Sequence, residues 1–216
     1  RLLDKIGSGS FGEVYLTKDA DGTFVAGKVE EKVKESRVQI EYKIYRNLHE
    51  SNRGFGLPKI YNFAETPVFY ILFMQLLGPS LEDMLDKYNR NLQMYTVLTL
   101  GEQLMYIMEN IHTAGYIHRD IKPNNFLIGL DENKSQIYIT DFGLSKKYIK
   151  RNKHIPYRNN RSLIGTARYA SINIHLGEEP SRRDDLESIG YMLVYLLKGS
   201  LPWQGMKKKG KKKDYL

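Results

Sequence analysis

Three short motifs follow one another along the chain, and together they limit its possible folds more than any other feature. They are Gly7-Ser8-Gly9-Ser10-Phe11-Gly12-Glu13-Val14, His118-Arg119-Asp120-Ile121-Lys122-Pro123-Asn124-Asn125 and Asp141-Phe142-Gly143. A lone glycine pattern often arises by chance, and by itself it is more typical of an ordinary glycine-rich hairpin. The ordered set, with Lys28 between the first two motifs, is rare. Order and spacing therefore carry more information than any single match.

The distribution of apolar residues predicts a β-rich part followed by a helical part. Short β-rich runs alternate with turns over roughly the first 75 residues, which predicts a small antiparallel sheet. These runs are Glu13 to Leu16, Phe24 to Val29, Ile60 to Phe63 and Val68 to Met74. Apolar residues three and four positions apart from Val38 to Leu48 predict one helix, with Glu41 outside its apolar face. Later helices are expected from about Tyr95 to His112 and from Arg183 to Leu197, the second apolar on most of its surface and buried.

Composition limits the class of protein, its location and the kinds of partner that it can bind. The chain has 216 residues, 41% of them hydrophobic, which is enough to bury a core. No apolar run approaches the roughly 20 residues of a membrane span, so no transmembrane segment is predicted. Cysteine is absent, which excludes disulfide and thiolate chemistry and favours an intracellular location, cytoplasmic or also nuclear. The net charge of +8 favours anionic partners without choosing among nucleotides, acidic proteins, nucleic acid and membranes.

The three motifs resemble the phosphate loop, catalytic loop and metal-binding turn of the eukaryotic protein kinases. The resemblance implies an ATP-using phosphotransferase of the α+β class with a bilobal fold, comprising a small β-rich N-lobe (1–75), a hinge (76–79) and a helical C-lobe (80–216). Kinase domains normally continue with further helices after Leu201-Pro202-Trp203. The kinase domain of residues 1–216 is therefore expected to be C-terminally incomplete, and poorly soluble or unstable when expressed alone.

The resemblance also implies roles for the charged residues of the motifs. Asp120 would orient the substrate hydroxyl and accept its proton, with Lys122 near the transferred phosphate. Asn125 and Asp141 would hold Mg²⁺ through oxygen atoms. Lys28 would contact the ATP phosphates and pair with Glu41, although a solvated surface lysine is the alternative. Thr166 would lie beside Asp120, and Asp185 would bind the catalytic loop.

Further residues are expected at the nucleotide. Small residues in the glycine turn let backbone amides approach the phosphates. Met74 would lie behind the adenine, and the backbone from Gln75 to Leu77 would contact it. The expected nucleotide-binding residues are Ile6, Gly7, Ser8, Gly9, Gly12, Val14, Ala26, Lys28, Met74, Gln75, Leu77 and Leu127.

A more specific resemblance comes from the segment that usually ends in Ala-Pro-Glu. Here it reads Gly165-Thr166-Ala167-Arg168-Tyr169-Ala170-Ser171-Ile172-Asn173, which is similar to the casein kinase I family. The strings Leu76 to Asp83, Ile155 to Arg158, Ser181 to Ser188 and Gly199 to Gly205 support this likeness. It implies a monomeric serine/threonine kinase that favours acidic or already phosphorylated substrates. Two residues depart from the family pattern: Gly27, which is expected to lose packing in its strand, and Gln75 in the hinge.

The basic residues agree with such substrates. The chain from Lys146 to Arg168 carries eight lysines and arginines and no acidic residue. Arg168 matches a position that binds substrate phosphate in the family, and Lys212 and Lys213 are further substrate-binding candidates. A solvated basic loop is the alternative for the first region. The run from Lys207 to Lys213 is interpreted as a phosphate-binding extension, a nuclear-import or nucleic-acid patch, or a solvated loop.

Three other functions remain open at this stage. A pseudoenzyme would have lost at least one of Lys28, Asp120, Asn125 and Asp141, and all four are present. A vaccinia-related kinase would share the Ser-Arg-Arg and Leu-Pro-Trp elements without the whole string from Ala167 to Asn173. A nucleic-acid-binding module is the least favoured, because the basic residues lack interleaved aromatic platforms.

Overall fold

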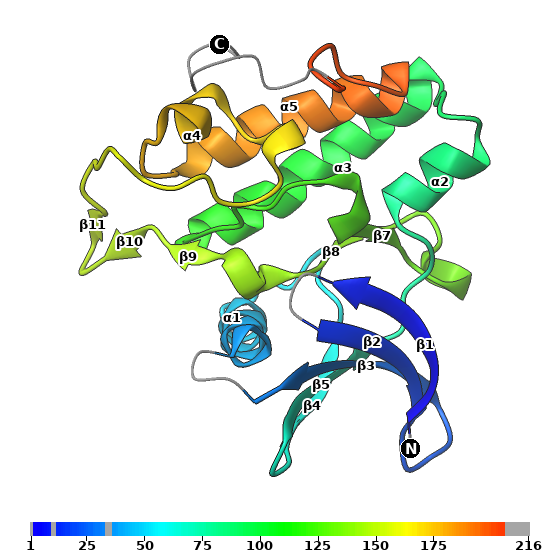
Figure 1. The fold of residues 1–216 in the computed structure, drawn as a ribbon. Coiled ribbons are helices and arrows are strands. Elements are labelled where there is room, and N and C mark those ends of the chain that lie inside the picture. Colours follow the sequence, from blue (N-terminus) through cyan, green and yellow to red (C-terminus); the bar gives the residue numbers. More distant parts are fainter. Residues whose placement is uncertain (1, 10–11, 33–35, 206–216) are drawn as a thin grey trace. The chain divides into compact units, whose positions relative to one another are not determined.

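The computed structural model describes residues 2–9, 12–32 and 36–205, so Lys207 to Lys213, with Lys212 and Lys213 among them, lie outside the described residues. The chain forms two compact units (Figure 1). The first comprises the chain up to Ser80 together with Asn125–Ser145. The second comprises Leu81–Asn124 and the chain from Lys146 onward. The grouping differs from the linear division at 76–79 expected from the sequence, because 125–145 pairs with and packs on elements of the first unit.

The first unit is built on a five-stranded antiparallel sheet in the order β1-β2-β3-β5-β4. Its strands are β1 (Leu2–Gly9), β2 (Gly12–Lys18), β3 (Phe24–Glu31), β4 (Ile60–Glu65) and β5 (Phe69–Gln75). The four predicted runs overlap β2, β3, β4 and β5, with Val68 just outside β5, which confirms the β-rich part, whereas β1 was not predicted. A short ladder of β7 (Phe126–Ile128) with β8 (Ile137–Ile139) belongs to the same unit, as do 3-10 turns at Asp131–Asn133 and Phe142–Leu144.

Strand β3 is the central strand, and four consecutive residues from Val25 to Lys28 are buried. Gly27 lies opposite Tyr15 on β2 and Phe73 on β5. A Cβ atom at Gly27 would lie 3.0 Å from the Thr17 methyl and 3.6 Å from the Phe73 ring. The expectation that Gly27 loses packing is therefore wrong, because neighbouring side chains already fill the space.

Helix α1 (Arg37–Glu50) packs on this sheet. Ser36 caps its start, since the Ser36 hydroxyl oxygen accepts a hydrogen bond from the Gln39 N–H (3.0 Å). The buried face holds Val38, Glu41, Ile44, Tyr45 and Leu48. Glu41 was expected outside this face, and that expectation is wrong because Lys28 and the Asp141 amide compensate its buried carboxylate.

The second unit is mainly helical. Its helices are α2 (Leu81–Lys87), α3 (Met94–Thr113), α4 (Ile172–Leu176) and α5 (Arg182–Lys198), with a 3-10 turn at Ala167–Tyr169. Its short strands are β6 (Tyr116–Ile117), β9 (Lys146–Lys147), β10 (Ile149–Lys150) and β11 (Lys153–His154). Strand β6 pairs with β9, and β10 pairs with β11. A further 3-10 turn spans Pro123–Asn125, where the two units meet in the sequence.

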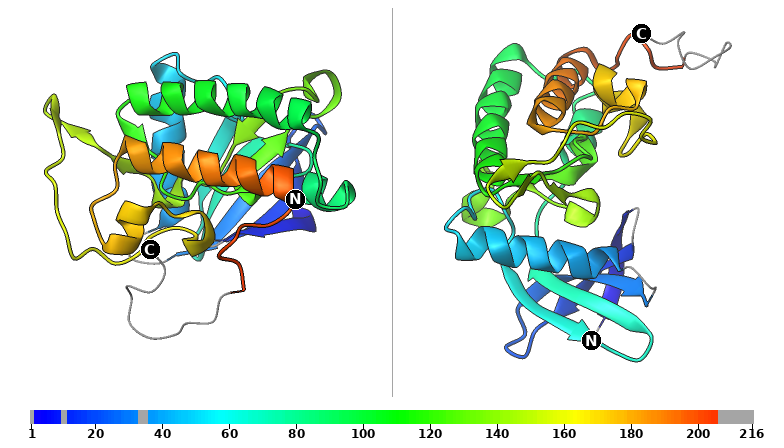
Figure 2. Two further views of the ribbon diagram at one scale, coloured as in Figure 1. Left: turned by 90° about the horizontal axis from the view of Figure 1, so that it is seen from above. Right: turned by 90° about the vertical axis from the view of Figure 1, so that its left-hand side faces the viewer.

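Helices α3 and α5 lie side by side in both views of Figure 2. Gly101 of α3 allows this approach, because a Cβ atom there would lie 3.4 Å from Leu193 of α5. Helix α5 begins with a capping box between Ser181 and Asp184. Its buried face includes Ile189, Met192, Tyr195 and Leu196. Leu186 and Val194 are exposed, so α5 is buried on one face and not over most of its surface.

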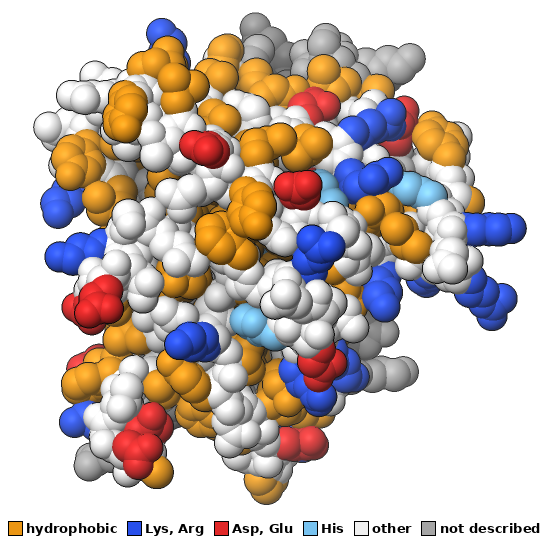
Figure 3. All heavy atoms as spheres, turned by 180° about the vertical axis from the view of Figure 1, so that it is seen from behind, with side chains coloured by type: hydrophobic (Ala, Val, Ile, Leu, Met, Phe, Trp, Pro, Cys, Tyr) orange, Lys and Arg blue, Asp and Glu red, His pale blue; other side chains and the backbone are white. Residues whose placement is uncertain are grey.

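Exposed apolar side chains gather on the outer face of α3. They are Met94, Tyr95, Leu98, Met105 and Tyr106. Seen from behind, the molecular surface carries hydrophobic side chains among charged ones (Figure 3). Within the described ranges, no helix is both long enough and apolar enough to cross a bilayer.

Candidate active site

In the first unit, Lys28, Glu41 and Asp141 form one buried cluster. Lys28 Nζ lies 2.6 Å from Glu41 Oε2 and 3.0 Å from Asp141 Oδ1. The Asp141 N–H donates to Glu41 Oε1 (3.1 Å), so the three residues form a closed network. Strand β3 places Lys28 and helix α1 places Glu41. The predicted pairing of these two residues is therefore present, and the solvated-lysine alternative does not hold because Lys28 is 5% exposed.

Burial and neighbouring charges shift the pKa values of this cluster in opposite directions. Burial lowers the pKa of the Lys28 ammonium, but the charges of Glu41 and Asp141 raise it by more, so the pKa of Lys28 lies above its ordinary value. Burial raises the pKa of Glu41, and the Lys28 charge offsets only part of this effect. Lys28 is therefore a permanent cation that two acidic residues hold in place.

Asp141 and Asn125 lie at the same end of the β7–β8 ladder. The Asn125 carbonyl oxygen accepts from the Thr140 N–H (2.8 Å) and from the Thr140 hydroxyl (3.3 Å). Asn125 and Asp141 are both buried. Among the described residues, no three His, Cys, Asp or Glu side chains are grouped closely enough to hold a metal. An amide and a carboxylate oxygen still suit Mg²⁺, which commonly takes one or two carboxylates and completes its shell with water and substrate phosphates.

The glycine turn joins β1 to β2 beside Asp141. Gly7 pairs with Val14, Ser8 with Glu13 and Gly9 with Gly12, while residues 10–11 lie outside the described ranges. A Cβ atom at Gly12 would lie 2.4 Å from the Val29 carbonyl oxygen, so only glycine fits there. A Cβ atom at Gly9 would lie 3.9 Å from Asp141 Oδ2. Ile6 is half exposed.

The other predicted nucleotide residues also lie in the first unit. Ala26 pairs with Leu16 on one side and Met74 on the other, and both Ala26 and Met74 are buried. Val14 pairs with Lys28. After Gln75, whose N–H donates to the Lys59 carbonyl (2.8 Å), the chain passes Leu77 and runs along β7. Gly78 donates to the Ile128 carbonyl, and Ser80 forms a β-bridge with Leu127.

In the second unit, Asp120 is held by two side chains. Lys122 Nζ lies 2.8 Å from Asp120 Oδ2, and the Thr166 hydroxyl donates to Asp120 Oδ1 (2.8 Å). Burial raises the pKa of Asp120, but hydrogen bonding and charge from Lys122 lower it by more, with help from Thr166. The pKa of Asp120 therefore lies below its ordinary value, and the group is a carboxylate at neutral pH. The expected contact between Thr166 and Asp120 is present.

Asp185 of α5 binds the backbone of the two residues that precede Asp120 in the sequence. It accepts from the N–H groups of His118 and Arg119 (both 2.9 Å) and lies 2.9 Å from His112 Nε2. Arg119 has a φ of 71°. The expected contact of Asp185 with the loop is thus present. His112 was missed from the sequence, and its only signal was a histidine near the end of an apolar helix.

Arg168 lies in the second unit against two tyrosines. Its guanidinium is 5.8 Å from the Tyr169 ring centre and 5.7 Å from that of Tyr195. The Trp203 indole N–H donates to the Arg168 carbonyl oxygen (2.8 Å). Tyr195 also donates to Glu82 Oε1 (2.7 Å). Tyr195 was missed because its apolar surroundings in the helix indicated only core packing.

Each unit therefore assembles its own share of the predicted residues. The first brings together Lys28, Glu41 and Asp141 beside the glycine turn, and the second brings together Asp120, Lys122 and Thr166. A family model described as the protein kinase domain matches residues 1–216. Members of this family transfer phosphoryl groups from ATP to protein substrates with divalent metal ions. Because the match spans the whole chain, the chain belongs to the protein kinase domain family and is a phosphotransferase.

Proposed function

We propose that the chain is a serine/threonine protein kinase of the casein kinase I type. It transfers the γ-phosphate of ATP to serine or threonine hydroxyls of acidic or already phosphorylated proteins. The observation that carries this proposal is the complete set of Lys28, Asp120, Asn125 and Asp141, in which the three charged side chains are buried and paired. A pseudoenzyme has no need to maintain buried charges at all of these positions.

The residues of the first unit would bind the nucleotide. The bound ATP supplies the phosphoryl group, and Mg²⁺ neutralises charge on its oxygens. Lys28, held by Glu41, contacts phosphate oxygens through an ammonium that stays charged. Asn125 and Asp141 offer oxygen ligands to the metal. The missing Cβ atom of Gly9 leaves space beside Asp141 in which the backbone can approach the phosphates, whereas Gly12 is needed because β3 packs against it.

The residues of the second unit would act on the protein substrate. Asp120 accepts a hydrogen bond from the substrate hydroxyl and takes its proton as the phosphoryl group is transferred. Thr166 and Lys122 fix the Asp120 carboxylate through one oxygen each. Lys122 also supplies positive charge near the transferred group. Efficient transfer needs this alignment more than it needs covalent chemistry.

Acidic substrates are supported by the charge of the segment from Lys146 to Arg168. Lys146 and Arg161 are already paired with the buried Glu179. Lys150, Arg151, Lys153 and Arg158 are exposed, so they remain accessible to an acidic peptide. Arg168 would bind a substrate phosphate through its guanidinium. Lys212 and Lys213 are kept as substrate-binding proposals from the sequence alone.

The deciding experiment measures Mg²⁺-dependent transfer of labelled γ-phosphate to matched serine peptides that are neutral, acidic or pre-phosphorylated. We expect transfer that favours the acidic and pre-phosphorylated peptides. Asp120→Asn should reduce kcat at least about 100-fold, because it removes the proton acceptor. Asp4→Asn changes an exposed aspartate on β1 in the same way and should leave kcat unchanged. Nucleotide binding without transfer by the folded wild-type chain would contradict the proposal and favour a pseudoenzyme.

A separate substitution tests the preference for phosphorylated substrates. Arg168→Gln should reduce the advantage of the pre-phosphorylated peptide over the neutral one about tenfold, the scale of one charge-assisted hydrogen bond. Turnover of the neutral peptide should change little. An unchanged preference would contradict the role of Arg168 and would leave the transfer reaction itself supported.

A further inference from the structure

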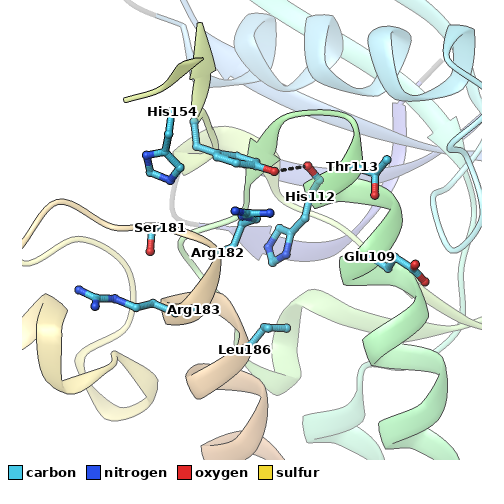
Figure 4. Close-up of a pocket in the computed structure, with 9 residues that line it drawn as sticks. Glu109, His112, Thr113, His154, Ser181, Arg182, Arg183 and Leu186 are labelled. Atoms are coloured by element: carbon cyan, nitrogen blue, oxygen red, sulfur yellow. Dashed lines mark hydrogen bonds between the residues drawn. The ribbon is translucent and has the colours of Figure 1, made fainter. Parts of the chain in front are cut away.

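A hollow with a volume of about 510 Å³ lies in the helical unit. Figure 4 shows the residues that line it, and none of them is a candidate catalytic or nucleotide residue. The end of α3, the segment at Tyr148 and His154, and the start of α5 form its walls. The volume falls within the range of small-ligand sites and exceeds the space that a free phosphate ion needs. The hollow can therefore admit a side chain together with part of the peptide that carries it.

The floor of this hollow is made of buried side chains that are hydrogen-bonded to their neighbours. Tyr148 is 2% exposed, and its hydroxyl donates to the His112 carbonyl oxygen (2.6 Å). The His112 ring is in turn fixed by Asp185 at 2.9 Å. A floor built from buried and hydrogen-bonded side chains needs little reordering when a ligand binds.

Arg182 supplies the positive charge over this floor. Its guanidinium lies 5.0 Å from the centre of the Tyr148 ring. Figure 4 shows the Arg182 side chain near His112, with its guanidinium in the hollow. No ion pair within 4.0 Å involves Arg182 among the described residues, whereas Arg183 pairs with Glu178 at 2.6 Å. Arginine stays charged at any physiological pH, and its planar donors match phosphate oxygens.

The remaining lining residues are mostly polar or aromatic. His154 Nδ1 lies 2.7 Å from the Ile155 carbonyl oxygen, which can only accept, so Nδ1 carries the proton. The His154 ring lies 5.4 Å from that of Tyr148. Glu109 is the single acidic residue among those that line the hollow, and two arginines line it as well. Of these two arginines, Arg182 is the one that forms no ion pair among the described residues.

We propose that this hollow binds a phosphorylated serine or threonine side chain of a peptide, with Arg182 as its principal contact. A phosphate monoester carries close to two negative charges and three acceptor oxygens, which a guanidinium recognises better than a single carboxylate does. The proposal does not depend on catalysis, because no lining residue belongs to the candidate catalytic or nucleotide set. It also assigns a phosphate contact separate from Arg168.

Phosphopeptide binding at the hollow is distinguished from binding at Arg168 by using the Arg168→Gln chain without ATP. A short neutral peptide with one phosphoserine is titrated into the ¹⁵N-labelled chain, and its unphosphorylated form serves as the reference probe. We expect saturable amide shifts at Tyr148, His154 and Ser181 to Leu186 with the phosphopeptide alone. Shifts of equal size with both peptides, or no shifts at these residues, would overturn the proposal.

Two further substitutions, each made in the Arg168→Gln chain, test the contact between Arg182 and the peptide phosphate. Arg182→Gln should weaken the phosphopeptide about tenfold or more, the scale of one charge-assisted hydrogen bond. Thr113→Glu keeps Arg182 on Tyr148 but adds a carboxylate to the wall, and it should weaken binding by a similar factor. Arg46→Gln, at an exposed arginine of α1, should leave affinity unchanged.

Thermal unfolding of each variant shows whether it folds. If Arg182→Gln fails to fold, Thr113→Glu decides the question by itself. Unchanged phosphopeptide affinity in folded Thr113→Glu, or equal losses in Arg46→Gln, would overturn the proposal. These experiments measure peptide binding and not phosphoryl transfer. Their outcome is therefore independent of whether the chain is an active kinase.

Discussion

Two residues of the motifs have left-handed backbone conformations that a side chain normally disfavours. Arg119 has a φ of 71°, and Asp141 has a φ of 68°. In each case the residue's own N–H donates to a buried carboxylate, that of Asp185 for Arg119 and that of Glu41 for Asp141. Such conformations cost about 1–3 kcal/mol and persist where the surroundings over-determine them. The two carboxylates therefore hold backbone geometry as well as charge.

A substitution at Gly165 tests how much a single left-handed residue beside Arg119 contributes to stability. It has a φ of 81°, and a Cβ atom there would lie 2.3 Å from the Arg119 carbonyl oxygen. We expect Gly165→Ala to lower the free energy of unfolding by at least about 2 kcal/mol, because the left-handed penalty adds to a clash with the backbone beside Asp120. Urea unfolding measures the loss, and kcat should fall in parallel.

The matched control is Gly22→Ala. Gly22 has nearly the same φ, 84°, but a Cβ atom there would have nothing within 4 Å. Its substitution should cost only the conformational penalty of about 1 kcal/mol and leave kcat unchanged. Equal losses in the two variants would show that the contact with Arg119 has no effect of its own.

At the scale of elements, strand β3 and helix α1 are joined by one carboxylate. Glu30 of β3 accepts from the Ser36 hydroxyl, the Arg37 N–H (3.0 Å) and the Val38 N–H (3.2 Å). These amides belong to the first turn of α1, which has no partners for them within the helix. The same strand carries Lys28, and the same helix carries Glu41. Glu30 therefore fixes the two elements whose spacing sets the Lys28 to Glu41 ion pair.

Glu30→Ala should weaken this connection. We expect it to lower the free energy of unfolding by about 2–3 kcal/mol, because three hydrogen bonds at the start of α1 are lost. The KM for ATP should rise more than kcat falls, since Lys28 is then held less firmly. Steady-state kinetics and urea unfolding measure the two effects.

Glu31→Ala changes the next residue of β3, which is exposed, and should alter stability by less than about 0.5 kcal/mol. A loss of stability in Glu30→Ala without any change in the KM for ATP would show that Glu30 caps α1 without positioning Lys28.

At the scale of the whole molecule, the exposed apolar face of α3 is the feature with the clearest physical consequence. Leu98 is 64% exposed, while its neighbour Val97 is 4% exposed. Adjacent large apolar side chains on one helix face favour self-association. Poor solubility stays a prediction from the sequence, and this face is one surface on which it can be tested.

Leu98→Lys should therefore raise the concentration at which the chain begins to self-associate, with little change in thermal stability. Light scattering across a concentration series measures the first effect. Val97→Lys is the matched control, and it should unfold the chain because it buries a charge. Unchanged self-association in folded Leu98→Lys would show that this face is not responsible.

Four of the five strands of the main sheet and three helices could be predicted from the sequence because their signals are local. The β-rich runs between turns marked β2, β3, β4 and β5, whereas no run was predicted at β1. Apolar spacing marked α1 and α3 within one or two residues of their ends. Lys28, Asp120 and Asp141 were proposed from the resemblance of the local motifs to those of the protein kinases, and the structure shows the ion pairs that each of them makes. Local sequence signals need no knowledge of distant contacts.

Only the tertiary structure decided where charge is buried. Polarity placed Glu41 outside the apolar face of α1, yet its partners Lys28 and Asp141 lie 13 and 100 positions away in the chain. Similarly distant neighbours make the contact of His112 with Asp185, the contact of Tyr195 with Arg168 and the hollow over Tyr148. A sequence pattern records the polarity of each side chain, whereas the cost of burying a charge is set by partners that only the fold brings within reach.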